Sequence, residues 1–461
     1  MLAKPKMPGS QKLADFLFNL QTADLPEKGL TLLKLCLLDT VGCALGGRAT
    51  EPGAVIDRML RKWSNNSKCI VIGSPVGAGP EMAAMANGVL AHALIFDDLH
   101  RHAKLHPGVA TIPAAWAVAD LAGASGSTFL AALAAGYETA ARVGVAIGMA
   151  SHRKQGWRAT GTVGSFGAAA AAARTFRLNA DEFHHAIAIA SAQASGNWAF
   201  QESAGMELYL AAGTAARNGT VSAMLAQAGM RGAADPLTAK DGGFLGLASD
   251  ETDPEQIAEG LGSHYRFLDT CIKMYPTCHS SQTGIDAAIN LRHRHSVKLD
   301  AIERVVVRAG EITRLQCGWN YEPAPPPKLI FHMGYAMALA IKNGEVRPSD
   351  FEGERPYDPE LTRVARATEV IADPELTAIY AERKPSDVTI YLRDGSMLHE
   401  RVEYCRGEPE NPPTPEVVLK KFKTVGSVYG KPELMDEIAD RILHVEREPN
   451  LSQLGKLLSQ S

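Results

Sequence analysis

Apolar side chains recur at helical spacing through the first 270 residues, and this pattern is the strongest limit on how the chain can fold. In the run LPEKGLTLLKLCLLDTVG, Leu30, Leu33 and Leu37 fall on one face of a helix, and Pro26 suits its first turn. Later stretches such as AALAAGYETAARVGVAIG consist largely of small residues, which lets neighbouring helices approach closely. We therefore expect a large all-helical domain.

The pattern changes after Pro276, where β-branched residues begin to alternate with polar ones. Residues 305–307 predict one strand, and residues 388–404, with a turn at Asp394-Gly395, predict a β-hairpin. Residues 331–344 have helical spacing and end in Asn-Gly, a typical helix end. These features predict a smaller domain that mixes strands and helices.

Together the patterns predict a mostly α protein, with a large all-helical domain and a smaller α+β lid domain. Beyond residue 412 the helical pattern returns, so we place the helical domain at residues 1–270 and 405–461 and the lid at residues 271–404. The Pro-rich stretch EPAPPPK, residues 322–328, predicts a loop within the lid. A chain of 461 residues is long enough for two domains, each with its own core.

The charge balance and the cysteines favour a cytoplasmic protein with a small-molecule partner. There are 47 Lys and Arg against 51 Asp and Glu, too even a balance to attract nucleic acid or an anionic membrane. The seven cysteines are scattered and form no CxxC pair, which argues against a disulfide framework and a zinc cluster. The start of the chain lacks the apolar core of a signal peptide, and charged residues interrupt the long apolar stretches.

The stretch HALIFDDLHRHAKLHPG, residues 92–108, is the most crowded in polar side chains. Its histidines and aspartates are suitable metal ligands, but their spacing differs from HExxH, which places two ligands one helical turn apart. We therefore expect at least two of its histidines to be exposed loop residues, with His100 and His102 the candidates. We expect His92 to be structural.

A proton-transfer site fits this stretch better than a metal site. Histidine titrates near neutrality, and a nearby carboxylate can set its tautomer and basicity. We assign proton transfer to His106, because Pro107 disfavours helical geometry there and a helix that stops at this point would leave His106 at the mouth of a cleft. Asp97 and Asp98 would brace the site as part of the catalytic group. Lys104 could orient a substrate carboxylate.

A second candidate stretch is HRKQGWRATGTVGSFGAAAAAA, which begins at His152. Thr160 precedes a long Ala-rich helix, so backbone N–H groups at the helix start could receive an anion beside Arg158. The absence of a GK[ST] ending and of a preceding strand rules against a nucleotide-binding loop. Tight helix packing is an equally good reason for the glycines.

A third candidate stretch, CIKMYPTCHSSQTGIDAA, contains Lys273, Cys278 and His279 close to the predicted domain junction, where small-molecule sites commonly form. We include all three as candidate site residues. A thiolate nucleophile made by Cys278 and His279 is disfavoured, because sequence neighbours seldom form such a pair. Tyr335, on the helix predicted at residues 331–344, is a further candidate for substrate binding.

Six segments in the same order resemble the MmgE/PrpD family over nearly the whole chain. They are LLDTVGCALGG, ANGVLAHALIFDD with LHPG, AGYETAARVG, TGTVGSFGAAAAAA, KMYPTCHSSQTGIDAA and RGEPENPPTPEVVLKKF. The resemblance implies a helical domain closed by an α+β lid, a homodimer, and no metal or organic cofactor. It also places His106 and Lys273 at catalytic positions of the family.

Several positions differ from the family pattern. Ile95 and Leu99 replace polar residues beside the two aspartates, and Leu208 stands where relatives have a lysine. Arg158 and Cys278 also occupy positions at which relatives carry other polar side chains, including histidine. Leu99 and Leu208 predict a less polar pocket, suited to a substrate with fewer carboxylates than a tricarboxylate.

The resemblance implies chemistry at a carbon next to a carboxylate, where a proton is removed or delivered. We expect a cofactor-independent lyase, most simply a dehydratase of a small hydroxy-carboxylate. The alternatives are an isomerase or epimerase that exchanges an α-proton, a decarboxylase, and a carboxylate-binding or inactive relative.

Overall fold

The computed structural model describes residues 7–460 except residue 66, and the chain divides into two compact units. The first unit comprises Met1–Trp198, Glu207–Thr270 and Thr414–Ser461, and the second comprises Ala199–Met206 and Cys271–Pro413. The chain returns to the first unit at Thr414, whereas the sequence places this return at residue 405. The first six residues, on which the expectation about a signal peptide partly rests, lie outside the described residues.

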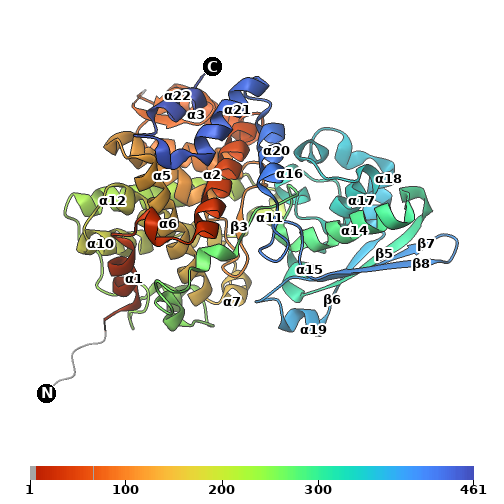
Figure 1. The fold of residues 1–461 in the computed structure, drawn as a ribbon. Helices are drawn as coiled ribbons and strands as arrows, with labels where there is room; N and C mark the ends of the chain where they lie inside the picture. Colours follow the sequence, from red (N-terminus) through yellow and green to blue (C-terminus); the bar gives the residue numbers. More distant parts are fainter. Residues whose placement is uncertain (1–6, 66, 461) are drawn as a thin grey trace. The chain divides into compact units, whose positions relative to one another are not determined.

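The first unit is built almost entirely from helices (Figure 1). Its helices are α1 (Gly9–Leu17), α2 (Glu27–Gly47), α3 (Glu51–Trp63), α4 (Pro80–His92), α5 (Gly108–Ala122), α6 (Gly126–Ala146), α7 (Met149–Lys154), α8 (Ala159–Thr162), α9 (Gly164–Thr175), α10 (Ala180–Ser191), α12 (Glu207–Gln227), α13 (Phe244–Ala248), α20 (Pro415–Gly426), α21 (Pro432–Leu443) and α22 (Ser452–Leu458). The strands β1 (Cys69–Val71) and β2 (Ser74–Ala78) form an antiparallel pair, and β3 (Leu99–His100) is a short strand.

Small residues allow the central helices of the first unit to pack closely around the buried helix α5. Ala110, Ala114, Ala168 and Ala215, from α5, α9 and α12, form one fully buried cluster. Gly213 of α12 lies so close to α4 that a Cβ atom there would be 2.4 Å from the carbonyl oxygen of Met85. This spacing explains why the sequence of these helices is rich in Ala and Gly.

Gly213→Ala should therefore lower the free energy of unfolding by about 1–3 kcal/mol, because the new methyl group would overlap the backbone of α4. Guanidinium denaturation of the purified protein measures this change. The matched control is Gly246→Ala in α13, where an added Cβ atom meets no atom within 4 Å. That control should change stability by less than about 1 kcal/mol. Equal effects of the two substitutions would contradict the packing argument.

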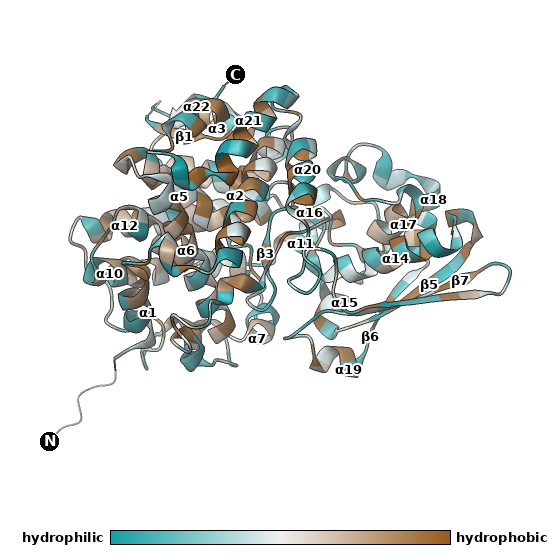
Figure 2. Ribbon diagram, viewed as in Figure 1, coloured by the Kyte–Doolittle hydropathy of each residue, from teal (hydrophilic) through white to brown (hydrophobic). Residues whose placement is uncertain are grey.

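Helix α2 is long and apolar enough to cross a membrane by length and composition, and apolar residues dominate it in Figure 2. However, 78% of its apolar stretch is buried inside the structure. This burial is the behaviour of a core helix.

The second unit contains a four-stranded sheet with the strand order β6-β5-β7-β8. Its strands are β5 (Ile302–Ala309), β6 (Thr368–Ala372), β7 (Ser386–Leu392) and β8 (Met397–Val402), and β4 (Thr270–Cys271) lies at the unit boundary. Its helices are α11 (Phe200–Ser203), α14 (Gln282–His295), α15 (Glu311–Cys317), α16 (Pro326–Leu329), α17 (Met333–Asn343), α18 (Pro359–Arg366) and α19 (Pro374–Ala378). Strands β5 and β6 are parallel, and the other two pairs are antiparallel.

The alternation of residues along the strands explains how this sheet is buried. In β5 the side chains of Val305 and Val307 are buried, and in the pairing strand β7 Val388 and Ile390 are buried opposite them. Helix α14 packs against β7 and β8. The sheet is therefore covered by helix on its apolar face.

The expected fold class is confirmed: a mostly helical protein with a smaller mixed domain. The hairpin turn at Gly395 and the helix end at Gly344 have the expected left-handed backbone, with φ values of 87° and 78°. The Pro-rich stretch is only partly a loop, because its end forms the short helix α16. There Pro326 and Pro327 occupy a first helical turn, which proline tolerates.

Candidate functional site

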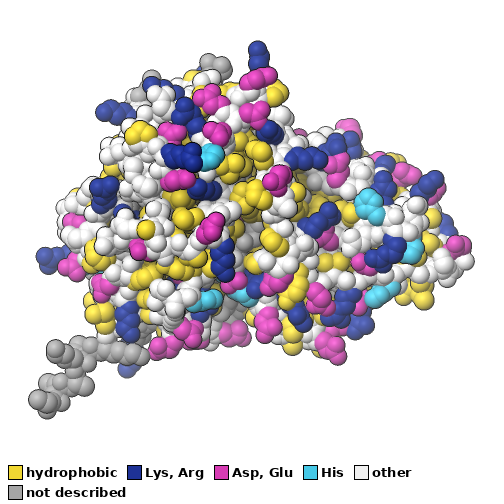
Figure 3. Space-filling view, viewed as in Figure 1, with side chains coloured by type: hydrophobic (Ala, Val, Ile, Leu, Met, Phe, Trp, Pro, Cys, Tyr) yellow, Lys and Arg dark blue, Asp and Glu magenta, His cyan; other side chains and the backbone are white. Residues whose placement is uncertain are grey.

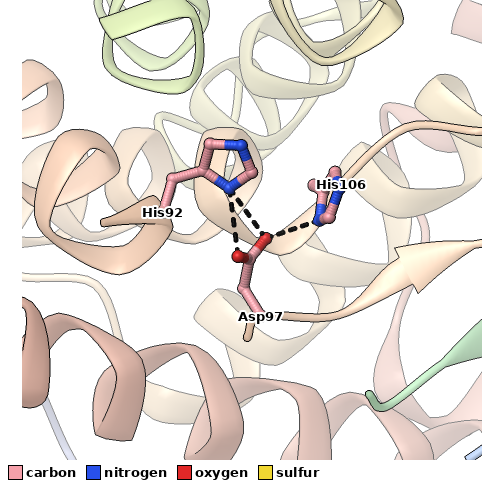
Figure 4. Close-up of side chains that lie close together, drawn as sticks. All are labelled: His92, Asp97 and His106. Carbon is pink, nitrogen blue, oxygen red and sulfur yellow. Dashed lines mark hydrogen bonds and ion pairs between the residues drawn. The ribbon is translucent and has the colours of Figure 1, made fainter. Parts of the chain in front are cut away.

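In the first unit, the carboxylate of Asp97 lies between two histidine rings (Figure 4). His92 Nδ1 is 3.0 Å from Asp97 Oδ1 and 3.1 Å from Oδ2, and His106 Nδ1 is 2.7 Å from Oδ2. The two rings meet edge to face, with centroids 4.7 Å apart. Asp97 and His92 are fully buried, whereas His106 retains 8% exposure. Of the three side chains, His106 is therefore the one that solvent can reach.

The local fold explains how these residues meet. Helix α4 ends at His92, and the chain then turns at Ile95, which adopts a left-handed backbone with φ 50°. This turn brings Asp97 back beside His92. His106 stands directly before Pro107, the residue that caps the start of α5. The expectation that a helix stops at this point is wrong: Pro107 begins a helix here, a position where its missing N–H costs nothing.

Arg158 fixes the tautomer of His92. Its Nη2 atom lies 2.7 Å from His92 Nε2, and a guanidinium can only donate, so Nε2 is the accepting nitrogen. His92 must then carry its proton on Nδ1 and donate it to Asp97. This chain of contacts, Arg158 to His92 to Asp97, makes His92 part of the candidate site, although the sequence predicted only a structural role for it.

Thr160 contacts the candidate site through its hydroxyl, which accepts a hydrogen bond from the His106 backbone N–H at 3.3 Å. The anion site expected around this residue is not supported, because the backbone N–H groups of Gly161 and Thr162 both donate to the Arg158 carbonyl. Helix α8, which contains these residues, has only four residues. Arg158 and Thr160 thus position the two histidines.

Asp97 is the anionic centre of this arrangement. Burial alone would favour its neutral form, but His92 and His106 outweigh that effect and hold its pKa well below the usual value. A carboxylate that stays ionised raises the basicity of the imidazole that donates to it. With Nδ1 of His106 engaged by Asp97, Nε2 is the nitrogen through which this ring can take or give a proton.

His92, Asp97 and His106 also have the atoms needed to hold a divalent cation. Two observations favour the hydrogen-bonded arrangement instead. The nitrogen-to-oxygen distances of 2.7–3.1 Å are ordinary hydrogen-bond lengths. In addition, Arg158 directs a donor at His92 Nε2, which leaves the proton of that ring on Nδ1. The geometry is therefore that of a proton-transfer pair with a supporting histidine.

Asp98, the neighbouring carboxylate, braces the start of α5 and contacts neither histidine ring in the described interactions. Its Oδ1 accepts from the Gly108 N–H at 3.0 Å, and its Oδ2 accepts from the Tyr137 hydroxyl at 2.5 Å. A Cβ atom at Gly108 would lie 2.8 Å from Asp98 Oδ2, so only glycine permits this approach. Burial raises the pKa of Asp98 to about 7, against the hydrogen bond from Tyr137.

This pKa predicts a pH dependence of stability. In the unfolded chain Asp98 loses its proton near pH 4, whereas the folded protein holds it until about pH 7. The free energy of unfolding should therefore fall as pH rises from 4 to 7, by up to about 1.4 kcal/mol per pH unit from this group. Asp98→Asn cannot lose a proton and should remove this slope.

Guanidinium denaturation of the wild-type protein and Asp98→Asn at pH 4, 5, 6 and 7 measures the difference. Burial also raises the pKa of Asp120 to about 7, and this residue is present in both proteins, so it contributes equally to both curves. Parallel curves for the two proteins would show that Asp98 titrates normally.

Lys421 holds the loop that precedes Asp97. From α20 its Nζ reaches α2, where it lies 2.5 Å from Asp39 Oδ1, and it donates to the Phe96 carbonyl at 2.6 Å. It also lies 3.8 Å from the Phe96 ring centroid. Both charged side chains are buried. No local pattern in the sequence indicates this contact, because its partners are separated by more than 300 residues.

The remaining polar residues of the stretch 92–108 are best described by their burial, hydrogen bonds and backbone conformation. His100 is 1% exposed, its Nε2 lies 2.7 Å from the Arg266 carbonyl, and its Nδ1 accepts from the Ala103 N–H. The expectation that at least two histidines here are exposed is wrong, because only His102 is partly open, with 27% of its side chain exposed. Lys104 occupies a left-handed turn with φ 50°.

In the second unit, Lys273 and Cys278 lie in one buried segment before α14. Lys273 is 1% exposed, and its Nζ lies 3.4 Å from the Thr277 carbonyl. The pKa of the Cys278 thiol is lowered to about 6, chiefly by a hydrogen bond from Cys317. Burial opposes this shift, and the charges of Lys384 and Lys273 assist it. Two buried lysines, one in this segment and one distant in sequence, thus act on the Cys278 thiol.

The two remaining candidates of the second unit are His279 and Tyr335. His279 is 5% exposed, and its Nδ1 lies 3.0 Å from Lys384 Nζ. Tyr335 is fully buried, stacks on Tyr321 and donates its hydroxyl to the Asp350 carbonyl at 2.7 Å. These contacts are those of a core residue and give no support to substrate binding by Tyr335.

Comparisons with known proteins cover both units. A model of the MmgE/PrpD N-terminal domain matches residues 11–257, and a model of the MmgE/PrpD C-terminal domain matches residues 275–445. Cis-aconitate decarboxylase from Aspergillus terreus is 29% identical, over 96% of this chain and 94% of that protein. Cis-aconitate decarboxylase from Homo sapiens is 24% identical, over 97% and 94%. 2-Methylcitrate dehydratase from Cupriavidus necator is 25% identical, over 84% of each chain.

Proposed function

Because the chain belongs to the MmgE/PrpD family, we propose that it is a lyase that acts on a small carboxylic acid. The bond that breaks would be on the carbon next to the carboxylate or on the neighbouring carbon. The observation that carries this proposal is the contact between His106 and the ionised Asp97 carboxylate. Both lyase reactions of the named relatives require a group that moves a proton at such a carbon. Charges of both signs are interspersed on the face seen in Figure 3, which suits a small-molecule substrate.

Dehydration of a hydroxy-carboxylate is the form of this activity that the sequence predicts. His106 Nε2 would remove the proton from the carbon next to the carboxylate. The electron pair of that C–H bond would form the new double bond as the hydroxyl leaves the adjacent carbon and takes up a proton from solvent to depart as water. Asp97 would stabilise the imidazolium formed on His106, as the carboxylate of a catalytic triad does.

Decarboxylation is a second candidate, and the comparisons favour it. The decarboxylases match 96–97% of this chain, whereas the dehydratases match 81–84%. In this reaction the C–CO₂ bond breaks, its electron pair stays on carbon, and the His106 imidazolium delivers a proton there. The same His106–Asp97 pair would serve, with the ring starting in its protonated form.

Three positions at which this chain departs from the family pattern bear on the proposed substrate. Ile95 and Leu99, next to the two aspartates, are 2% and 5% exposed, and Leu208 is fully buried. None of them can neutralise a carboxylate. A substrate with one or two carboxylates is therefore expected to be turned over faster than a tricarboxylate.

Proton NMR of the purified protein with a panel of acids in D₂O tests the proposal. The panel contains mono-, di- and tricarboxylic hydroxy acids and unsaturated acids, including 2-methylcitrate and cis-aconitate. Dehydration yields new alkene protons, decarboxylation yields CO₂ and one deuterium on the product, and an epimerase would only exchange the α-proton. His106→Asn should abolish the reaction. Exchange without bond breaking, or no turnover of any acid, would reject the lyase proposal.

We also predict that Lys273 takes part in the reaction, since the resemblance places it at a catalytic position and its side chain is buried. Lys273→Met should lower kcat/KM by about 100- to 1,000-fold, the usual cost of losing one group that stabilises developing negative charge. The matched control is Lys342→Met in the same unit, whose ammonium forms half-exposed surface ion pairs. Equal activities of the two variants would remove Lys273 from the reaction.

The resemblance also implies a homodimer, which we propose for this chain. Light scattering of the purified protein during size-exclusion chromatography measures the mass. A mass of about one chain would contradict it.

A further inference from the structure

Two cysteine side chains meet in the second unit, between the segment before α14 and the end of α15. Cys278 directly precedes the short turn that leads into α14, and Cys317 is the last residue of α15. The Cys317 thiol donates a hydrogen bond to the Cys278 sulfur. From this contact we infer that the two residues form a peroxide-reactive pair, in which Cys278 is oxidised first and Cys317 then closes a disulfide.

Polar contacts around Gln316 hold the two segments together. Gln316 precedes Cys317 on α15, and its Oε1 accepts a hydrogen bond from Ser280 Oγ at 3.0 Å. The same oxygen lies 3.9 Å from Cys278 Sγ. The backbone of Cys278 is also fixed, because its N–H donates to the Ile330 carbonyl at 3.1 Å. The fold therefore keeps the two thiols in contact, so a disulfide can close by side-chain rotation and a small backbone shift.

Cys278 is the cysteine that a small oxidant can reach. It retains 9% exposure, whereas each of the other six cysteines, all of which the structure describes, is at most 1% exposed. Hydrogen peroxide is close to water in size, so a narrow opening admits it. Cys317 is fully buried and would not meet the oxidant first. The order of the two oxidation steps therefore follows from exposure.

The surroundings of Cys278 also favour its thiolate. The hydrogen bond from Cys317 lowers the pKa of the Cys278 thiol to about 6, against the effect of burial. The Ser280 N–H and the charges of Lys384 and Lys273 lower it in the same direction. At pH 7 most of Cys278 is therefore thiolate, which is the form that attacks a peroxide.

Other buried cysteines lack such surroundings and serve as an internal comparison. Burial raises the pKa of the Cys36 and Cys405 thiols well above the usual value, and it raises the pKa of Cys69 to about 12. These three side chains stay protonated near neutral pH and are unreactive. Selective oxidation of Cys278 is therefore expected.

The oxidation consists of two balanced steps. The Cys278 thiolate attacks one oxygen of hydrogen peroxide: an S–O bond forms, the O–O bond breaks and hydroxide leaves, which gives a sulfenic acid. The Cys317 sulfur then attacks the Cys278 sulfur: the S–S bond forms, the S–O bond breaks, and the leaving hydroxide takes the Cys317 proton as water. The two sulfur atoms give up two electrons in total, and these reduce the peroxide to one hydroxide and one water.

The disulfide would regulate the reaction through Lys273, a consequence that rests on the proposed function. Lys273 precedes Cys278 in the same buried segment, and its charge acts on the thiolate. A disulfide carries no charge, so oxidation removes a negative charge that acts on Lys273 and also ties its segment to α15. We therefore expect oxidation to lower kcat/KM at least about 10-fold, because small displacements of a catalytic group are costly. A dithiol reductant should restore the activity.

Peptide mapping of the full-length protein tests the pair. The protein is reduced, freed of reductant, treated with hydrogen peroxide, alkylated under denaturing conditions and digested without reductant. Mass spectrometry should find one cross-linked peptide that joins Cys278 to Cys317. Cys278→Ser should abolish it. Cys317→Ser should stop the oxidation at the sulfenic acid, which a cyclic 1,3-diketone traps on Cys278. Cys69→Ser, which removes a buried cysteine outside the pair, should form the disulfide as the wild-type protein does.

The wild-type peptide map needs no variant, so it does not depend on whether the serine proteins fold. Absence of the Cys278–Cys317 peptide after peroxide treatment, or oxidation of Cys69 as fast as Cys278, would overturn the inference. Full activity of the cross-linked protein would overturn the regulatory role of the disulfide. If the reduced protein turns over no acid, the proposed function fails, and the peptide map still decides whether the pair reacts.

Discussion

Asp97→Asn should lower kcat/KM about 100- to 10,000-fold, the range seen when the residue that orients a catalytic histidine is changed to its amide. Both His92 and His106 direct Nδ1 at the two oxygens of Asp97. Asparagine keeps one oxygen and places an N–H donor in the other position. At least one ring must then accept at Nδ1 and move its proton to Nε2. Since Arg158 already donates to Nε2 of His92, the ring that changes is His106.

This change would place a proton on the nitrogen that we propose as the base. Nitrogen-15 NMR of labelled protein distinguishes the two tautomers and requires no substrate, so it tests the positioning role separately from activity. The matched control is Asp120→Asn on α5, whose carboxylate accepts from the Ile70 N–H at 2.8 Å and which an asparagine oxygen can replace. The argument fails if Asp97→Asn leaves the His106 tautomer and kcat/KM as in the control.

The fold class could be predicted from the sequence because its signals are local. Helical spacing in the first 270 residues and strand alternation around Val305 and Val388 each report the burial of one face of one element. Glycine at 344 and 395 marks a left-handed backbone where a helix or a hairpin ends. The boundaries were less predictable, because the return of the chain to the first unit at Thr414 is decided by tertiary contacts that no local pattern records.

The candidate site could be predicted only in part, for the same reason. The proximity of His106 and Asp97 could be anticipated because both lie within one polar stretch. The role of His92 was missed, since the turn at Ile95 that folds Asp97 back onto it has no signature in an Ile residue, which seldom adopts positive φ. The burial of His100 was also missed, because its partner is a backbone carbonyl 166 residues away.

Lys421→Met should lower the free energy of unfolding by about 3–5 kcal/mol, the usual cost of removing one partner of a buried ion pair. The substitution leaves the Asp39 carboxylate, which is 1% exposed, without the ammonium that lies 2.5 Å from it. It also removes the donor to the Phe96 carbonyl, next to Asp97. Guanidinium denaturation measures the loss. Lys34→Met is the control, because the ion pair of Lys34 with Glu446 is only partly buried and should contribute about 0–1 kcal/mol.

The double variant Asp39→Leu with Lys421→Met separates charge burial from loop positioning. Removing both charges replaces a buried ion pair by apolar side chains, which is often neutral for stability, so most of the lost free energy should return. The Phe96 carbonyl would still lack its Lys421 donor, so the loop of Asp97 would stay less restrained. We therefore expect the double variant to be stable but still reduced in kcat/KM. Full recovery of both properties would show that Lys421 contributes charge balance alone, and recovery of neither would show that the ion pair is not the source of the effect.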